Sequence, residues 1–220
     1  WKQTSHHLKE LYGGTEFEKD HLLFSPQLPD GVDMTKEPER IEDFQKWTAP
    51  IATTLDEFLK CHKVDWNRIY LEGNGESCML AAYLAAVKPR LFAGVILRNP
   101  PAFEKLKMEN YLHLPLLVLE DASHAGNHKS LQEALAKLGR EKVSLPGEKE
   151  VAALTVIADA GDYPFAKAQK RIHDWVGTVE RNPSPSRLCF RPLFSEMKNH
   201  WLISIQNYIT YVENATASYY

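Results

Sequence analysis

Residues 68–86 read Arg68-Ile-Tyr-Leu-Glu-Gly-Asn-Gly-Glu-Ser-Cys-Met-Leu-Ala-Ala-Tyr-Leu-Ala-Ala86. The β-favouring residues at the start predict a strand over residues 68–72, and the glycines that follow predict a tight turn. The alanine- and leucine-rich remainder, from Ser77 to Ala86, predicts a helix that ends before Pro89. The stretch therefore predicts a strand, a turn and a helix, the unit from which parallel α/β sheets are built.

The rest of the chain repeats this alternation of short apolar runs with longer amphipathic segments. Further strands are predicted at 21–25, 92–97, 114–119 and 151–157, and helices at 6–12, 38–59, 131–138 and 165–176. Pro50 falls inside the second of these helices and is expected to kink or restart it. The pattern predicts an α/β fold with a mostly parallel sheet flanked by helices.

The composition is that of an ordinary globular domain, with 44% apolar and 25% charged residues among 220. The formal net charge of −3, from 26 basic and 29 acidic residues, offers no basic excess for nucleic acid or for a membrane surface. The longest apolar run, Met79 to Val87, is far shorter than the roughly 20 residues that cross a bilayer. The three cysteines have no metal-ligand spacing. We therefore expect no nucleic acid, membrane, metal or cofactor.

The character of the sequence changes near residue 180. The run Asn182-Pro-Ser-Pro-Ser186 is typical of a linker, and the residues after it are rich in aromatic and β-branched types. We expect an α/β domain at 1–180, followed by a linker and a short β-rich extension at 181–220. Because the first residue is Trp1, we expect the sequence to be part of a longer polypeptide, and it leaves the cellular compartment open.

Residues 68–86 resemble the nucleophile elbow of the α/β-hydrolases, in which a strand ends in Gly-x-Ser-x-Gly and a helix rich in small residues follows. The resemblance extends over residues 20–178 and is closest to serine esterases and peptidases of the dienelactone hydrolase and prolyl oligopeptidase kinds. By this resemblance, 114–121 matches the strand that delivers the catalytic acid, and 159–162 matches the histidine loop. The family's strand before His21, which carries oxyanion donors, has no counterpart in this sequence.

At the elbow itself, the family's first glycine matches Gly73, its nucleophile matches Gly75, and its last glycine matches Ser77. No hydroxyl stands at the nucleophile position. Glycine suits the strained backbone of an elbow, and Ser77 is small enough for strand and helix to approach and for its hydroxyl to help cap the helix. The resemblance therefore implies a noncatalytic binding or scaffolding module, with Gly73, Asn74, Gly75 and Glu76 as its binding residues.

The first alternative is an active serine hydrolase with a displaced nucleophile. Ser77 would attack the substrate, His124 would accept the proton, and Asp121 or Asp162 would orient the histidine. This frame requires the strand to run two residues longer, and it puts Met79 where the family has a small residue. It predicts covalent labelling at Ser77.

The second alternative is a ligand- or carbohydrate-binding module that works through its cleft or through aromatic residues of the C-terminal extension, such as Trp201 and Tyr208. A small molecule or a peptide would be the ligand. Cys78 could serve as a nucleophile in place of a hydroxyl, but a cysteine within an alanine-rich helix is expected to be a buried packing residue.

Overall fold

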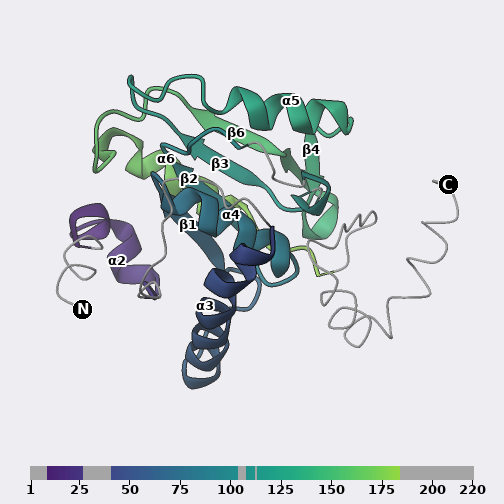
Figure 1. Ribbon diagram of the computed structural model, residues 1–220. Helices are drawn as coiled ribbons and strands as arrows, with labels where there is room; N and C mark the ends of the chain where they lie inside the picture. Colours follow the sequence, from purple (N-terminus) through teal and green to yellow (C-terminus); the bar gives the residue numbers. More distant parts are fainter. Residues whose placement is uncertain (1–8, 27–40, 104–107, 112, 184–220) are drawn as a thin grey trace, which may run out of the picture.

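The computed structural model describes residues 9–26, 41–103, 108–111 and 113–183 of the chain (Figure 1). Within these ranges, a four-stranded sheet runs in the order β1-β2-β3-β6, and each of its strand pairs is parallel. Its strands are β1 (Tyr70–Asn74), β2 (Gly94–Arg98), β3 (Leu116–Leu119) and β6 (Leu154–Ile157). A separate antiparallel pair joins β4 (Lys142–Ser144) to β5 (Glu150–Ala152).

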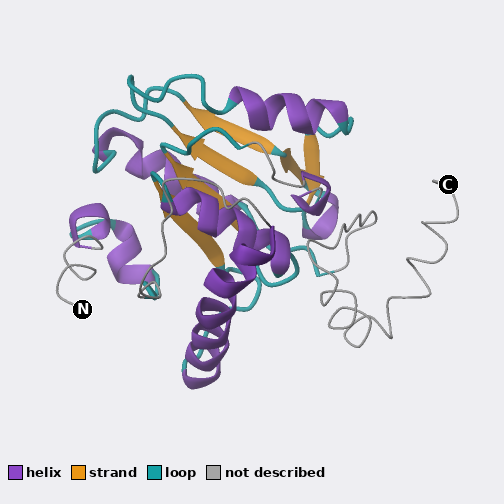
Figure 2. Cartoon of the chain, viewed as in Figure 1, coloured by secondary structure: helices purple, strands orange, loops and turns teal. Residues whose placement is uncertain are grey.

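Helices cover both faces of the sheet (Figure 2). One hydrophobic core includes residues of α3 (Ile41–Cys61), α4 (Ser77–Val87) and α5 (Lys129–Lys137). The other core includes helical residues 9–12, α2 (Glu16–Asp20) and α6 (Gln169–Thr178). Short 3-10 helices lie at Met108–Tyr111, Pro146–Glu148 and Ala166–Ala168. In the part of the chain that the structure describes, no helix has both the length and the apolar character needed to span a membrane.

The strand side chains alternate between these two cores. Val95 and Leu97 pack in the core with α4, whereas Ile96, Leu117 and Leu119 pack in the core with α6. Every residue of β2 and β3 is buried. Burial on both faces explains why these strands are continuous apolar runs in the sequence. The predicted architecture, an α/β fold with a mostly parallel sheet flanked by helices, is confirmed.

The predicted strand at 21–25 is wrong. Residues 21–26 have no regular secondary structure, although the backbone of His21 is extended, with φ −125° and ψ 142°. The side chain of Leu22 is 56% exposed. A strand needs a neighbour for its backbone groups as well as an apolar composition, and no described strand pairs with these residues.

The apolar run at 151–157, predicted as one strand, is two strands that join different sheets. The break falls at Ala153, whose N–H donates to Glu141 O at 2.8 Å and whose carbonyl accepts from Leu116 N at 2.9 Å. Before the break, β5 pairs with β4; after it, β6 completes the parallel sheet. Composition cannot reveal such a change of partner, because both halves are equally suited to a strand.

The other predicted elements are found with shifted ends; of the helix predicted at 6–12, residues 9–12 are helical and residues 6–8 lie outside the described ranges. The helix at 38–59 is present as α3, which runs through Pro50 as one helix. The helix at 165–176 begins with the 3-10 turn at Ala166–Ala168 and continues as α6. The predicted β-rich extension lies almost wholly beyond Pro183 and thus outside the described residues.

Candidate functional site

The carboxyl ends of the four parallel strands lie at the same edge of the sheet. This edge is where ligands bind in open α/β sheets. The turn after β1 contains Gly75 and Glu76, β2 is followed by Asn99, and β3 is followed by Glu120 and Asp121. The predicted site residues therefore belong to the ends of neighbouring strands.

The turn between β1 and α4 depends on two glycines in different ways. Gly75 has a φ of +57°, and a Cβ added there would have no atom within 4 Å. At Gly73, a Cβ would lie only 2.5 Å from the Cα of Cys78. Gly73 therefore lets strand and helix touch, whereas Gly75 supplies the left-handed backbone of the turn. Neither residue offers a side chain that could react.

Ser77 begins α4, and its hydroxyl bonds to the end of the strand. The Oγ accepts a hydrogen bond from Asn74 N at 2.7 Å and donates one to Asn74 O at 2.9 Å. It has no further hydrogen-bond partner among the described residues. The expectation that this hydroxyl caps the helix is wrong, because it satisfies strand groups and leaves the helix N–H groups untouched.

The loop after β3 brings Asp121 and His124 together. His124 Nδ1 lies 2.8 Å from Asp121 Oδ1, and Ser123 Oγ donates to the same carboxylate oxygen at 2.7 Å. Asn99 Nδ2 donates to Asp121 Oδ2 at 2.6 Å. Burial by itself raises the pKa of Asp121, but the hydrogen bonds from Ser123, His124 and Asn99 outweigh it and hold that pKa well below its usual range. Asp121 is therefore a well-anchored carboxylate.

The structure does not assemble the predicted hydrolase constellation into one hydrogen-bonded unit. Within the described residues, no hydrogen bond joins His124 to Ser77. Asp162 is exposed in the loop after β6, and among the described residues its carboxylate has no hydrogen bond or ion pair, while its carbonyl accepts from Phe165 N at 2.8 Å. Asn74 and Ser77 form one group, Asp121 and His124 form another, and Asp162 belongs to neither.

Next to Asp121, the buried carboxylate of Glu120 organises the same loop. It accepts hydrogen bonds from Gly126 N at 2.8 Å, from His128 N at 2.7 Å and from His128 Nδ1 at 2.8 Å. Burial raises the pKa of Glu120, but these hydrogen bonds outweigh burial and lower it. The sequence shows an acidic residue at the end of a strand and nothing of its partners, so this role could not be predicted.

A second buried ionic group joins β1 to β2, and sequence reasoning missed it. The guanidinium of Arg98, fully buried, donates to Glu72 at 2.8 Å and 3.3 Å and to the hydroxyl of Tyr12 at 3.3 Å. The Tyr12 hydroxyl in turn bonds to Glu72. Arg98 also lies over the ring of Phe165, 5.4 Å from its centroid. An arginine in an apolar run was the one available signal, since a buried charge needs a partner.

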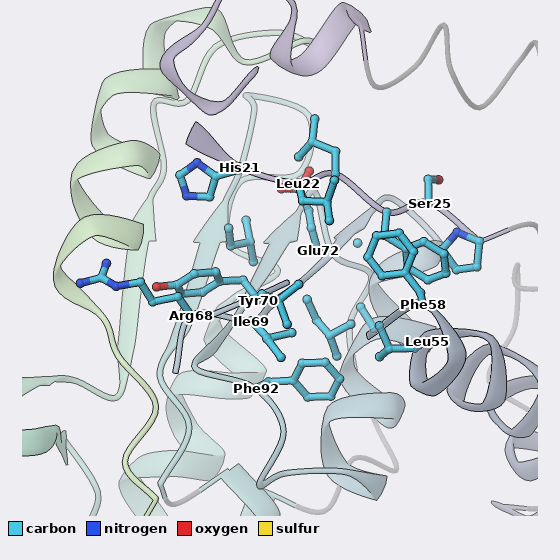
Figure 3. A pocket seen from close by; sticks show the side chains of 18 of the residues that line it. His21, Leu22, Ser25, Leu55, Phe58, Arg68, Ile69, Tyr70, Glu72 and Phe92 are labelled. Atoms are coloured by element: carbon cyan, nitrogen blue, oxygen red, sulfur yellow. The ribbon is translucent and has the colours of Figure 1, made fainter. Parts of the chain in front are cut away.

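A cavity of about 920 Å³ lies beside β1 (Figure 3). Most of its lining side chains are apolar and come from α3, α4 and the segment at 11–26. Glu72, Asn74 and Ser77 contribute polar groups, so the cavity reaches the turn that sequence reasoning selected. Its volume lies within the range of about 300–1,000 Å³ that is typical of ligand pockets. No group of three or more potential metal ligands occurs among the residues that can be described.

The topology, with successive parallel strands side by side and helices on both faces, is that of an open α/β fold. No protein-family model matches the sequence, and comparison with curated proteins finds no match. Among solved structures, the chain is similar to a protein described as a thermostable esterase, with 18% sequence identity and a TM-score of 0.47. The similarity covers 62% of this chain and 37% of that esterase, so the chain spans less than half of its length.

Proposed function

We propose that residues 1–180 form a noncatalytic α/β-hydrolase-like domain that acts as a binding module. The observation that carries the proposal is Gly75, which occupies the left-handed position of the turn between β1 and α4 and has no hydroxyl. An elbow gains its reactivity from the side chain at that position. With glycine there, the backbone of the turn is kept and the nucleophile is absent.

The hydrogen bonds of Ser77 favour this proposal over a displaced nucleophile. An attacking serine needs a general base within hydrogen-bond reach, at about 2.6–3.2 Å. The Ser77 hydroxyl instead accepts from and donates to the backbone of Asn74. His124 Nδ1 bonds to Asp121 and Ser123, and the bond to Asp121 is the one that an orienting acid would make. No hydrogen bond joins His124 to Ser77 among the described residues, however. Activating Ser77 would require its bonds to Asn74 to be broken and His124 to come within reach.

Binding, as opposed to pure scaffolding, is favoured by the cavity beside β1. Its lining is mainly apolar, and its charged and polar residues are Asp20, His21, Ser25, Lys63, Asp65, Arg68, Glu72, Asn74 and Ser77. Such a lining suits a small molecule or a peptide that carries both apolar and polar groups. We propose a ligand of this kind for the module.

The deciding experiment is labelling with a fluorophosphonate probe, followed by mass spectrometry of the modified peptides. We expect no stoichiometric adduct on the folded chain and no turnover of a short-chain p-nitrophenyl ester. The Ser77→Ala variant and the matched control Ser130→Ala, whose hydroxyl donates to Asn127 O at 3.2 Å, are treated in parallel. A stoichiometric adduct on Ser77 that is lost in Ser77→Ala and kept in Ser130→Ala would overturn the proposal and establish a serine hydrolase.

A further inference from the structure

Residues of the segment at 9–26 line one side of the cavity, and the first part of this segment is anchored by hydrogen bonds. Gln169 Nε2 donates to Leu11 O at 2.8 Å, and Arg98 donates to the Tyr12 hydroxyl at 3.3 Å. Among the residues that are described, the backbone-to-backbone hydrogen bonds of the segment all stay within it. The segment is therefore attached to the rest of the fold without strand pairing.

The second part of the segment, from Phe17 to Phe24, is attached by packing. The ring of Phe17 lies edge-on to His173 of α6, with centroids 5.2 Å apart, and against His21 at 4.9 Å. Phe24 stacks on Phe58 of α3 at 4.3 Å. Within the described ranges, no hydrogen bond or ion pair joins this part of the segment to another element. Its position on the cavity therefore depends on these ring contacts and on apolar packing.

Two histidines face each other in this contact, His21 of the cavity wall (Figure 3) and His173 of α6, with ring centroids 6.2 Å apart. Nδ1 of His21 is buried and has no hydrogen-bond partner among the described residues. A protonated imidazole carries N–H groups on both nitrogens, so the charged form would place a buried donor there without an acceptor. Burial lowers the pKa of His21, and the nearby His173 lowers it further.

The remaining charged groups around His21 do not offset this effect. Asp20, its neighbour in the chain, raises the pKa of His21, whereas Arg68, which precedes β1, lowers it. On α6, Lys170 and Asp174 pair with each other at 2.8 Å. The pKa of His21 remains below its ordinary value, so the docked segment favours the neutral ring. Taking up a proton therefore weakens the contact between the segment and α6.

We propose that residues 16–24 form a pH-sensitive gate, which leaves α6 and opens the cavity beside β1 when His21, next to His173, takes up a proton. Residues 9–12 stay anchored by their hydrogen bonds and act as the fixed end of the gate. The inference goes beyond the proposed function, because it concerns access to the cavity and not the ligand or reaction that the cavity serves.

The direction of the pH effect follows from the two states of His21. In the released segment the ring titrates near the ordinary histidine value of 6.5, and in the docked segment it titrates lower. As the pH falls through 6.5, the released state binds the proton first and gains population, until the docked ring is protonated as well. The gate is therefore closed at about pH 7.5 and opens more often at about pH 5.5.

The test measures hydrogen exchange by mass spectrometry on the full 220-residue chain at pH 7.5 and pH 5.5, with the intrinsic pH dependence of exchange removed. Between the two pH values, protection of residues 16–24 should fall by about threefold to tenfold, whereas β2 and β3 should keep theirs. Equal protection of 16–24 at both pH values would overturn the inference. An equal fall over β2 and β3 would overturn it too, because the whole domain would then be unfolding.

Three variants assign the response to its histidine. His21→Phe keeps a ring in place and removes the titrating group, so protection of 16–24 should change less than about twofold between the two pH values. His173→Gln removes the facing imidazole and should reduce the response as well. His62→Gln alters an exposed histidine that stacks on Phe58, and as the matched control it should keep the full response. A full response in His21→Phe, or its loss in His62→Gln, would contradict the assignment.

Opening of the cavity is followed with the apolar dye anilinonaphthalene sulfonate. Its fluorescence with the unaltered chain should rise about twofold or more from pH 7.5 to pH 5.5. His21→Phe keeps every other titrating group, so it controls for the general change of charge and should show no such rise. Unchanged fluorescence with the unaltered chain would overturn the gate. Labelling of Ser77 by a fluorophosphonate would remove the noncatalytic function and leave this inference intact, so the two proposals fail separately.

Discussion

The hydroxyl of Ser77 closes two hydrogen bonds with the backbone of Asn74, accepting from its N–H at 2.7 Å and donating to its carbonyl at 2.9 Å. Asn74 is the last residue of β1, and Ser77 is the first of α4. This serine thus stabilises the end of β1. This arrangement makes the serine a structural residue of the turn.

Removing this hydroxyl should lower stability without affecting any hydrolysis. Ser77→Ala leaves both backbone groups of Asn74 without their partner, which should reduce the free energy of unfolding by about 1–2 kcal/mol. Urea denaturation measures the change. Ser130→Ala, which loses a single hydrogen bond at 3.2 Å, should cost less. An unchanged stability in Ser77→Ala would contradict the structural role.

The two glycines of the turn between β1 and α4 should respond differently to the addition of one methyl group. Gly75→Ala has room for its Cβ and should cost about 1–2 kcal/mol, the price of a left-handed backbone. Gly73→Ala forces its Cβ against the backbone of Cys78 and should cost about 3 kcal/mol or more. Gly14→Ala, at φ +73° with open space, is the control for Gly75. Urea denaturation of the three variants checks the geometry of the turn. Gly73→Ala should lower the free energy of unfolding most, and Gly75→Ala and Gly14→Ala should lower it by similar, smaller amounts.

The ion pair of Glu72 and Arg98 should show strong coupling. Glu72→Gln leaves the charge of Arg98, which is fully buried, without its carboxylate and should destabilise the protein by about 3 kcal/mol. Combining Glu72→Gln with Arg98→Met removes the unpaired buried charge. The free energy of unfolding of the double variant should therefore fall by less than the sum of the decreases in the two single variants. A double-mutant cycle by urea denaturation measures this coupling, and additive losses would refute it.

The carboxylates after β3 should make the protein sensitive to acid. The native pKa values of Glu120 and Asp121 lie below the ordinary values of 4.5 and 3.8. Their contribution to stability is thus complete above about pH 5 and is lost as the pH falls through the native values, because the unfolded chain binds protons first. Glu120→Gln should lower stability at pH 7 and flatten its decline in acid, whereas the exposed control Glu133→Gln should do neither. Thermal denaturation from pH 7 to pH 3 measures both effects.

The two described cysteines should differ sharply in reactivity. Cys61 is exposed, whereas Cys78 is fully buried and its Sγ lies 3.2 Å from Arg98 O. Burial raises the pKa of Cys78 well above the usual value, so almost no reactive thiolate forms there. Iodoacetamide at pH 8 should modify Cys61 rapidly and Cys78 only after denaturation, as peptide mapping can show. Rapid modification of Cys78 in the folded chain would argue against its role as a packing residue.

Local sequence determined the parts of this protein that depend on neighbours along the chain. The unit at 68–86 was predictable because a β-favouring run, two glycines and a helix-forming run each act within a few residues. The strands β2 and β3 were predictable because burial on both faces leaves an apolar run. The left-handed conformation at Gly75 also follows from the chain itself, since a reversal between strand and helix favours glycine.

Tertiary structure alone decided which groups meet. The run at 151–157 divides between two sheets because Ala153 bonds to Glu141 on one side and to Leu116 on the other. Arg98 donates a hydrogen bond to Glu72 on the neighbouring strand, and Asn99 donates one to Asp121 in another loop. The same holds for 21–25, whose residues pair with none of the described strands and border a cavity. A hydrogen bond or an ion pair needs two groups that are close in space. The sequence around one group does not identify a partner that is distant along the chain.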